Sequence, residues 1–138
     1  MVSGTSTVQV TRSGAPEARQ SWEEISSREV NDRWTEFLVL PELVAPPDDF
    51  ARLVRDLGAA AGSPGEAALA VCRLVQDQVE VSPGATTVED PAARAWERRA
   101  GACHGLVHLT IGGLRTLGIP ARYISGYIHP IEDPVIGD

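Results

Sequence analysis

The stretch RAGACHGLVHLTIGGL, residues 99–114, places a cysteine between a glycine-containing turn and an apolar run. A largely apolar helical face, which we expect to be buried, continues through and past the stretch: Leu106, Val107, Thr110, Ile111, Leu114 and Leu117. Gly118, with Pro120 just beyond, is typical of a helix end. The pattern therefore predicts a helix that begins at Cys103 and ends at Gly118.

Two neighbouring glycines, Gly112 and Gly113, lie inside this predicted helix. Glycine in a helix interior costs about 1 kcal/mol relative to alanine. Such a cost is explained when the helix backbone must come close to another element. We therefore expect close packing at this pair.

The position of Cys103 offers two interpretations. At a helix N-terminus a thiolate faces unpaired backbone N–H groups and the positive end of the helix dipole, which both favour the charged, nucleophilic form. Gly101 permits an irregular backbone just before the cysteine and a close approach by a substrate. Free cysteine is also among the most buried residue types. From its position alone, Cys103 is equally well a nucleophile or a small core residue.

Two helices are predicted between residues 48 and 79. The first starts at an aspartate cap, Asp48 or Asp49, and ends near Gly58 or in the alanine run that follows. Its apolar face is Phe50, Leu53, Val54 and Leu57. The second starts at a capping box, residues 63–66, with proline at the first helical position. Its apolar face is Ala67, Val71, Leu74, Val75 and Val79, with Cys72 expected in the core beside it.

The remaining secondary-structure signals are shorter. Asp90-Pro91 predicts the start of a short helix that carries Trp96 as a core anchor, rather than as a donor to an oxyanion. Over residues 22–44 the signals fit both a short helix and an extended segment. Alternating side chains predict one strand over residues 7–11 and another over residues 122–128.

Length and composition narrow the class of protein. With 138 residues, 43% of them hydrophobic, the chain is long enough for one core and too short for two full domains. A formal charge of −7 and a pI near 4.9 argue against nucleic acid and anionic membranes as partners, because both need a basic surface. Two cysteines are too few for a secreted disulfide scaffold, which favours a reducing, cytoplasmic compartment. The sequence does not exclude a single disulfide between Cys72 and Cys103.

The residues around the cysteine resemble a known family. In order they are Gly101-Ala102-Cys103, then His108-Leu109, then RTLGIPARYISGY over residues 115–127. They resemble the core of bacterial transglutaminase-like proteins, whose pattern runs roughly G-V-C-Q-D-F-A-H-L, a helix, and R-x-L-G-I-P-A-R-Y-V-S-G-Y. Upstream, residues 83–86, Pro-Gly-Ala-Thr, look like the P-G-x-T loop of the family.

The resemblance implies an α+β, papain-like transglutaminase core, in which a Cys, His, Asp triad transfers the acyl group of an amide or hydrolyses it. It makes Cys103 the catalytic nucleophile. The family histidine, in an S-H-A-W-like motif, and the later aspartate, in a D-P-T-like motif, do not occur before Asp138. We therefore expect a fragment. Residues 1–20 are the terminal strand and linker of a preceding β domain, and residues 21–138 are the helix-rich half of the core with its first core strand.

The chain departs from the family pattern at its polar residues, with His104-Gly105 where Gln-Asp is usual. Within a helix, neither His104 nor His108 is well placed to hydrogen-bond the Cys103 sulfur. Both histidines and a cysteine could in principle hold a metal, but there is no Cys-x-x-Cys, and the family commonly has a histidine at position 108. We therefore expect no metal and no cofactor. His129 is expected at a strand end in solvent.

The implied function is cysteine-dependent acyl chemistry on a protein or peptide amide, through a thioester at Cys103 that water or an amine resolves. Hydrolysis is the expected outcome because nothing in the sequence indicates an amine site. The alternative is a non-enzymatic binding or structural module on the same fold, supported by His104-Gly105. The isolated fragment is expected to be inactive. Its unpaired strand edge and uncovered apolar surface predict self-association.

Overall fold

The structure is a computed structural model, and it describes residues 19–126. In chain order the elements are α1 Trp22–Ile25, α2 Arg28–Arg33, the 3₁₀ helix η1 Thr35–Phe37, α3 Asp48–Ala60, α4 Pro64–Gln78, β1 Glu80–Val81, α5 Ala92–Arg98, β2 Ala100–Gly101 and α6 Cys103–Thr116. The two strands form a small parallel sheet, so the fold is α+β, as predicted. Within the described residues, no helix is long and apolar enough to span a membrane.

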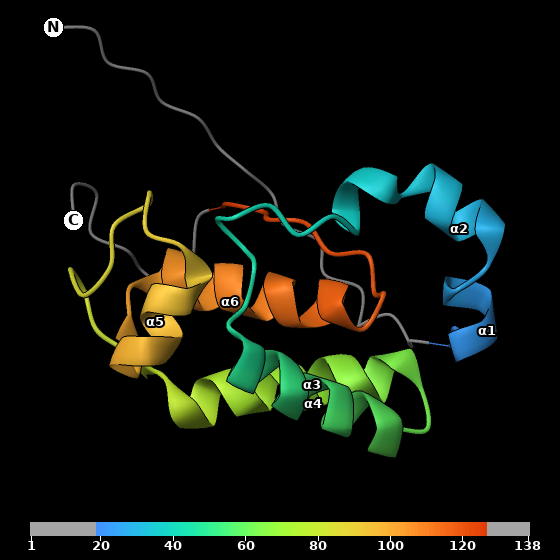
Figure 1. The fold of residues 1–138 in the computed structure, drawn as a ribbon, viewed down its shortest axis with the longest axis horizontal. Helices are drawn as coiled ribbons and strands as arrows, with labels where there is room; N and C mark the ends of the chain where they lie inside the picture. The colour runs from blue at the N-terminus through green and yellow to red at the C-terminus, as the bar shows by residue number, and fades with distance from the viewer. Residues whose placement is uncertain (1–18, 127–138) are drawn as a thin grey trace, which may run out of the picture.

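Helix α6 crosses the centre of the molecule (Figure 1). Helices α3 and α4, joined by a short turn, pack along one side of it, and α5 packs beside its N-terminal end. The short helices α1 and α2 lie at the opposite end, where the indole Nε1 of Trp22 donates a hydrogen bond to Ala61 O at 3.3 Å. The residues at the start of α6 are therefore surrounded by α5, β2 and the loop between β1 and α5.

The helix starts follow the predicted signals with small shifts. At α4, Ser63 Oγ accepts from Glu66 N at 3.2 Å, and Pro64 occupies the first helical position. The Glu66 carboxylate accepts from Gly62 N at 2.9 Å rather than from the cap residue, so the capping box closes one residue early. At α3 and α5 the cap residues are Pro47 and Pro91. Asp48 and Asp49 therefore lie in the first turn of α3, where the helix dipole favours negative charge.

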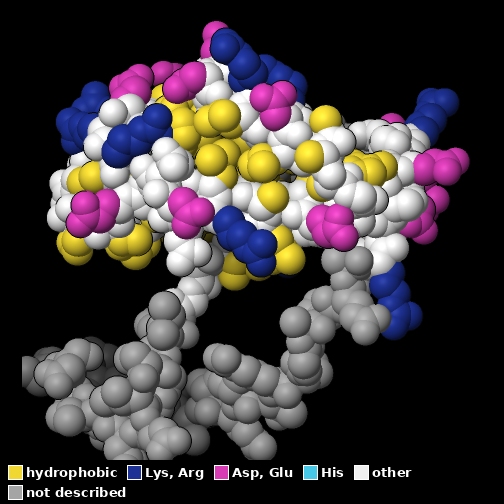
Figure 2. All heavy atoms as spheres, turned by 90° about the horizontal axis from the view of Figure 1, so that it is seen from below, with side chains coloured by type: hydrophobic (Ala, Val, Ile, Leu, Met, Phe, Trp, Pro, Cys, Tyr) yellow, Lys and Arg dark blue, Asp and Glu magenta, His cyan; other side chains and the backbone are white. Residues whose placement is uncertain are grey.

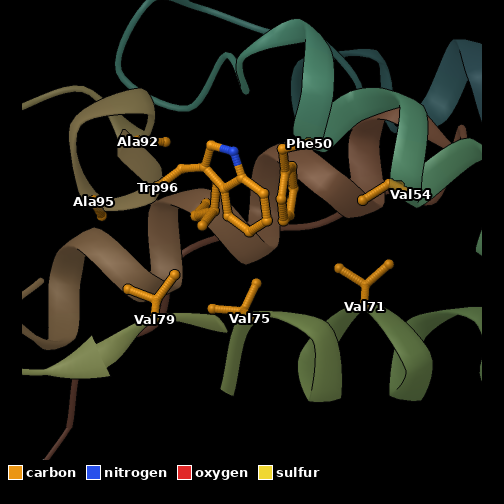
Figure 3. Close-up of a cluster of buried hydrophobic side chains, with 9 residues drawn as sticks. Phe50, Val54, Val71, Val75, Val79, Ala92, Ala95 and Trp96 are labelled. Atoms are coloured by element: carbon orange, nitrogen blue, oxygen red, sulfur yellow. The ribbon is translucent and has the colours of Figure 1, made fainter. Parts of the chain in front are cut away.

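The hydrophobic core is formed where α3, α4, α5 and α6 meet (Figure 3). Its buried members are Phe50, Val54, Val71, Val75, Val79, Ala92, Ala95, Trp96 and Leu109. The rings of Phe50 and Trp96 meet edge to face with centroids 4.8 Å apart, a favourable geometry for aromatic pairs. The predicted role of Trp96 as a core anchor is confirmed. On α6, Ile111 is buried, and Leu114 and Leu117 pack partly buried against the core.

The glycine pair of α6 packs as predicted. A Cβ atom on Gly112 would overlap the carbonyl oxygen of Val44. A Cβ atom on Gly113 would lie 2.9 Å from Val71 Cγ1 and 3.2 Å from Phe50 Cε1. The missing side chains therefore let the backbone of α6 contact both the segment before α3 and the core.

Three predicted core residues are exposed: Val107 on α6, which is 37% exposed, and one residue on each of α3 and α4. Leu53 is 43% exposed, and Cys72 is also exposed, so all three predictions were wrong. The exposed residues of α3 and α4 are each a direct neighbour of a fully buried valine, Val54 or Val71, and successive residues of a helix point about 100° apart. The buried stripes of α3 and α4 are narrower than the apolar pattern. Figure 2 shows hydrophobic side chains gathered on the face seen from below, with charged side chains around them.

The segment after α6 is not the predicted strand. It leaves the helix at Gly118, whose φ of 74° glycine adopts easily, and returns along α6 (Figure 1). Ala121 N donates to Phe37 O at 3.0 Å, and the Arg115 guanidinium donates to Ala121 O. Residues 122–126 pair with no other strand in the described part of the chain, and a strand needs a ladder partner. Residues 127–128, His129 and the predicted strand at 7–11 lie outside the described residues.

Candidate active site

Cys103 is the first residue of α6, as predicted. The cap residue before it, Ala102, is extended, with φ −71° and ψ 165°, and offers no side-chain hydrogen bond to the helix. Cys103 is exposed, so it is not a core residue. Cys72 is exposed as well, and both thiols are free, so no disulfide joins them.

The first turn of α6 has donors without acceptors. Gly105 N and Leu106 N both donate to Ala102 O, at 2.9 Å and 3.3 Å. Among the described residues, no acceptor takes the N–H of Cys103 or of His104. Unpaired N–H groups at a helix start attract negative charge. The exposed sulfur therefore lies beside amides that could receive a developing oxyanion.

A tight turn brings the chain from α5 to Cys103. Helix α5 ends at Arg98, and its C-cap residue is Arg99, a non-glycine residue in the left-handed region with φ 53°. The guanidinium carbon of Arg99 lies 3.5 Å from the centroid of the Trp96 ring. Hydrogen bonds from β1 and the residue after it fix the segment that leads to Cys103: Glu80 N donates to Arg99 O and Ser82 N donates to Gly101 O, both at 2.9 Å.

Gly101 itself faces protein rather than open space. A Cβ atom there would lie 3.0 Å from both Ala95 Cβ and Leu106 Cδ1. The residue is buried in β2. Close packing against α5 and α6 therefore explains why a glycine occupies position 101. The space beside it is filled by protein, so a close approach by a substrate does not explain it.

Thr86 is a site residue to which the sequence patterns assigned no role. It lies in the loop of residues 82–91, corresponding to the last position of the P-G-x-T resemblance, and is only 4% exposed. Its Oγ1 accepts a hydrogen bond from Ala102 N at 3.0 Å and lies 3.5 Å from His104 Nε2. A Cβ atom on Gly105 would come within 2.8 Å of the same oxygen. Thr86 thus touches the residues on both sides of Cys103, and the unusual His104-Gly105 pair is what accommodates it.

The two helical histidines lie near each other and make no hydrogen bond to the cysteine within the described residues. Their ring centroids are 6.3 Å apart, and the His108 ring is 5.6 Å from that of Tyr123. Burial lowers the pKa of His108, and the nearby His104 lowers it further. His108 Nδ1 is buried and has no hydrogen-bond partner among the described residues. Within residues 19–126, no hydrogen bond reaches Cys103 Sγ from either ring.

A cavity of about 290 Å³ lies next to these rings and is lined by Leu43, Val88, His104, His108 and Tyr123. None of the described residues that line it is a carboxylate. Across residues 19–126, no three His, Cys, Asp or Glu side chains gather in a group that could hold a metal ion.

The indole of Trp96 is committed to the fold. Its Nε1 donates to Asp49 Oδ2 at 2.7 Å, which ties α5 to the first turn of α3. That hydrogen bond is the main reason why the pKa of Asp49 lies below its ordinary value, and the nearby Arg99 charge contributes less. The N–H is therefore not free for an oxyanion.

Comparison with known proteins places these features in context. A family model described as the transglutaminase-like superfamily matches residues 51–135, which include Cys103, both helical histidines and Thr86. The chain is also 35% identical over 120 residues to the uncharacterized protein ML0607 of Mycobacterium leprae (strain TN). That alignment covers 87% of this chain and 43% of the relative, so the chain spans less than half of the relative's length. No solved structure matches the chain significantly.

Proposed function

Because the chain belongs to the transglutaminase-like superfamily, we propose that Cys103 is the nucleophile of a cysteine acyl-transfer or amide-hydrolysis reaction. The observation that carries this proposal is an exposed thiol at the first position of a helix whose cap residue leaves the N–H groups of Cys103 and His104 unpaired among the described residues. Unpaired N–H groups and the positive end of the helix dipole at that position stabilise the negative charge that attack by the sulfur creates. An amide of a protein or peptide is the proposed substrate.

The proposed reaction has two stages. The Cys103 sulfur bonds to the amide carbonyl carbon, the carbonyl electrons move to oxygen, and the resulting oxyanion faces the free N–H groups at the start of α6. The oxyanion then collapses, the carbon–nitrogen bond breaks, and the nitrogen leaves as an amine after it takes up a proton. Water attacks the thioester in the second stage, releasing a carboxylic acid and the thiol. An amine in place of water would release a new amide.

The reaction requires a base that accepts and donates protons, and no such base lies at the thiol among the described residues. No histidine in residues 19–126 hydrogen-bonds Cys103 Sγ. We propose that the base is supplied from outside these residues. General acid–base catalysis is typically worth about 10² to 10⁴ in rate. The chain studied by itself is therefore expected to show a reactive cysteine without substantial turnover.

The test compares the two cysteines of one chain. Both are exposed, so unequal burial does not explain a difference in their rates. Limiting iodoacetamide, followed by peptide mass spectrometry at several pH values, should modify Cys103 faster than Cys72. Amide hydrolysis and amine incorporation should stay at background.

Cys103→Ser and Cys72→Ser variants assign each labelled peptide. Equal, slow labelling of the two thiols would contradict the nucleophile proposal and favour the non-enzymatic module. Turnover that Cys103→Ala abolishes, and that His104→Gln or His108→Gln abolishes as well, would contradict the proposal that the base lies outside residues 19–126.

A further inference from the structure

The loop of residues 82–91 is built to hold one buried side chain, Thr86. The adjacent Thr87 and Val88 are exposed, whereas Thr86 is buried. On one side of Thr86, Arg98 Nη1 donates to Ala85 O at 2.6 Å. On the other side, Thr87 N donates to Asp90 Oδ2 at 2.7 Å. The backbone is thus tied down on both sides of Thr86, so its hydroxyl has a defined position.

That hydroxyl lies among the residues that flank the cysteine. Oγ1 accepts from Ala102 N at 3.0 Å and contacts His104 Nε2 at 3.5 Å, the first being the stronger interaction by distance. It also fills the space that a Cβ atom on Gly105 would need. One oxygen from a distant loop therefore contacts the chain both before and after Cys103.

This contact replaces a missing helix cap. Most helices gain a cap hydrogen bond from a Ser, Thr, Asp or Asn side chain, which bonds to an amide inside the first turn. Ala102 cannot do so. Thr86 instead accepts a hydrogen bond from the N–H of the cap residue Ala102, which anchors the Gly101–Ala102 peptide and leaves the first-turn N–H groups of Cys103 and His104 unpaired.

We propose that Thr86 is a positioning residue for Cys103: its hydroxyl anchors the Gly101–Ala102 peptide, and so fixes the backbone that enters α6, so that the sulfur and the free N–H groups of Cys103 and His104 face the same reacting group. This inference rests on the proposed function. Thr86 does not touch the reacting atoms, and it acts through the backbone of Ala102. A side-chain cap on α6 would take one of those amides, so the anchor from the loop keeps it available to an oxyanion.

The test measures the ratio of the Cys103 and Cys72 alkylation rates within one chain, across a pH series. Thr86→Val keeps the shape of the side chain and removes the hydroxyl, which should lower the ratio about three- to tenfold, the equivalent of one lost hydrogen bond. Thr86→Ser keeps the hydroxyl and should restore most of the ratio. Thr87→Val, which removes the adjacent exposed hydroxyl, is the matched control and should leave the ratio unchanged.

Circular dichroism establishes that each variant is folded. If Thr86→Val does not fold, Gly105→Ala is the substitute, because its methyl group displaces the Thr86 hydroxyl from the opposite side. A folded Thr86→Val variant with the wild-type ratio would overturn the inference, as would failure of Thr86→Ser to recover it. If the wild-type Cys103 is no faster than Cys72, the proposed function fails instead, so the two failures are distinguishable.

Discussion

The two halves of α6 meet very different surroundings. The C-terminal half packs its glycine pair against a carbonyl of the segment before α3 and against side chains of the core. The N-terminal half carries the exposed Cys103, has unpaired amides, and is held by the hydroxyl of Thr86. One helix thus separates the two tasks: its second half secures the fold, and its first half presents the candidate chemistry.

The glycines of the two halves show the same contrast. At Gly112 the space is closed by a backbone carbonyl, which cannot move without shifting the whole segment. At Gly105 the space is closed by a side-chain atom, Thr86 Oγ1, rather than by backbone. Substitution in the second half should therefore damage the fold, and substitution in the first half should damage the site.

The largest effect is expected for Gly112→Ala. The added methyl group overlaps Val44 O, and overpacking of this kind costs about 3 kcal/mol or more when backbone must shift, against a gain of about 1 kcal/mol in helix propensity. Urea denaturation should show a clear loss of stability. Gly126→Ala, where no described residue lies within 4 Å of the new Cβ atom, is the control and should be close to wild type. Equal stability of the two variants would contradict the view that the second half of α6 is tightly packed against the segment before α3.

A smaller effect on stability is expected for Gly105→Ala. Displacing the Thr86 hydroxyl loses one hydrogen bond worth about 1 kcal/mol, and alanine regains a similar amount in helix propensity. The free energy of unfolding should therefore change by no more than about 1 kcal/mol, while the alkylation rate of Cys103 falls. Denaturation and labelling of the same sample measure both quantities. A loss of stability as large as that of Gly112→Ala would show that both halves are equally rigid.

The most modest effect is expected from pH, at His108, where the two halves meet. Burial holds the folded-state pKa of His108 below its ordinary value of about 6.5. At pH values between the folded-state pKa and about 6.5, the unfolded chain binds more protons than the folded one, so stability should fall as pH falls below about 6.5.

A His108→Gln variant should flatten this dependence in urea denaturation at pH 5 to 8. His104→Gln removes only the lesser of the two causes and should change the slope less. Unchanged pH dependence in His108→Gln would mean that this ring is not held uncharged by its surroundings.

Much of the fold follows from short-range patterns in the sequence. Periodic apolar residues and start signals predicted α3, α4, α5 and α6, because helix formation depends on residues within a few positions of one another. The glycine pair correctly predicted close packing. The motifs around Cys103 correctly predicted the family and the place of this cysteine at a helix start.

Patterns of that range do not determine which polar groups meet across the fold. Thr86 and Ala102 are 16 residues apart, and their hydrogen bond exists only because β1, α5 and β2 fold the chain back on itself. For the same reason the apolar pattern misassigned Cys72: which stripe of α4 is covered depends on where α3 and α6 pack. The segment after α6 shows why strands are harder to predict than helices. Alternating side chains favour a strand, but a strand forms only when a partner strand is available to pair with it.

The sequence by itself determined the helices, the family and the position of the candidate nucleophile, because local periodicity and motif spacing are enough for these. The tertiary structure alone decided what anchors that nucleophile and what stays exposed, because both depend on contacts between segments distant in the chain.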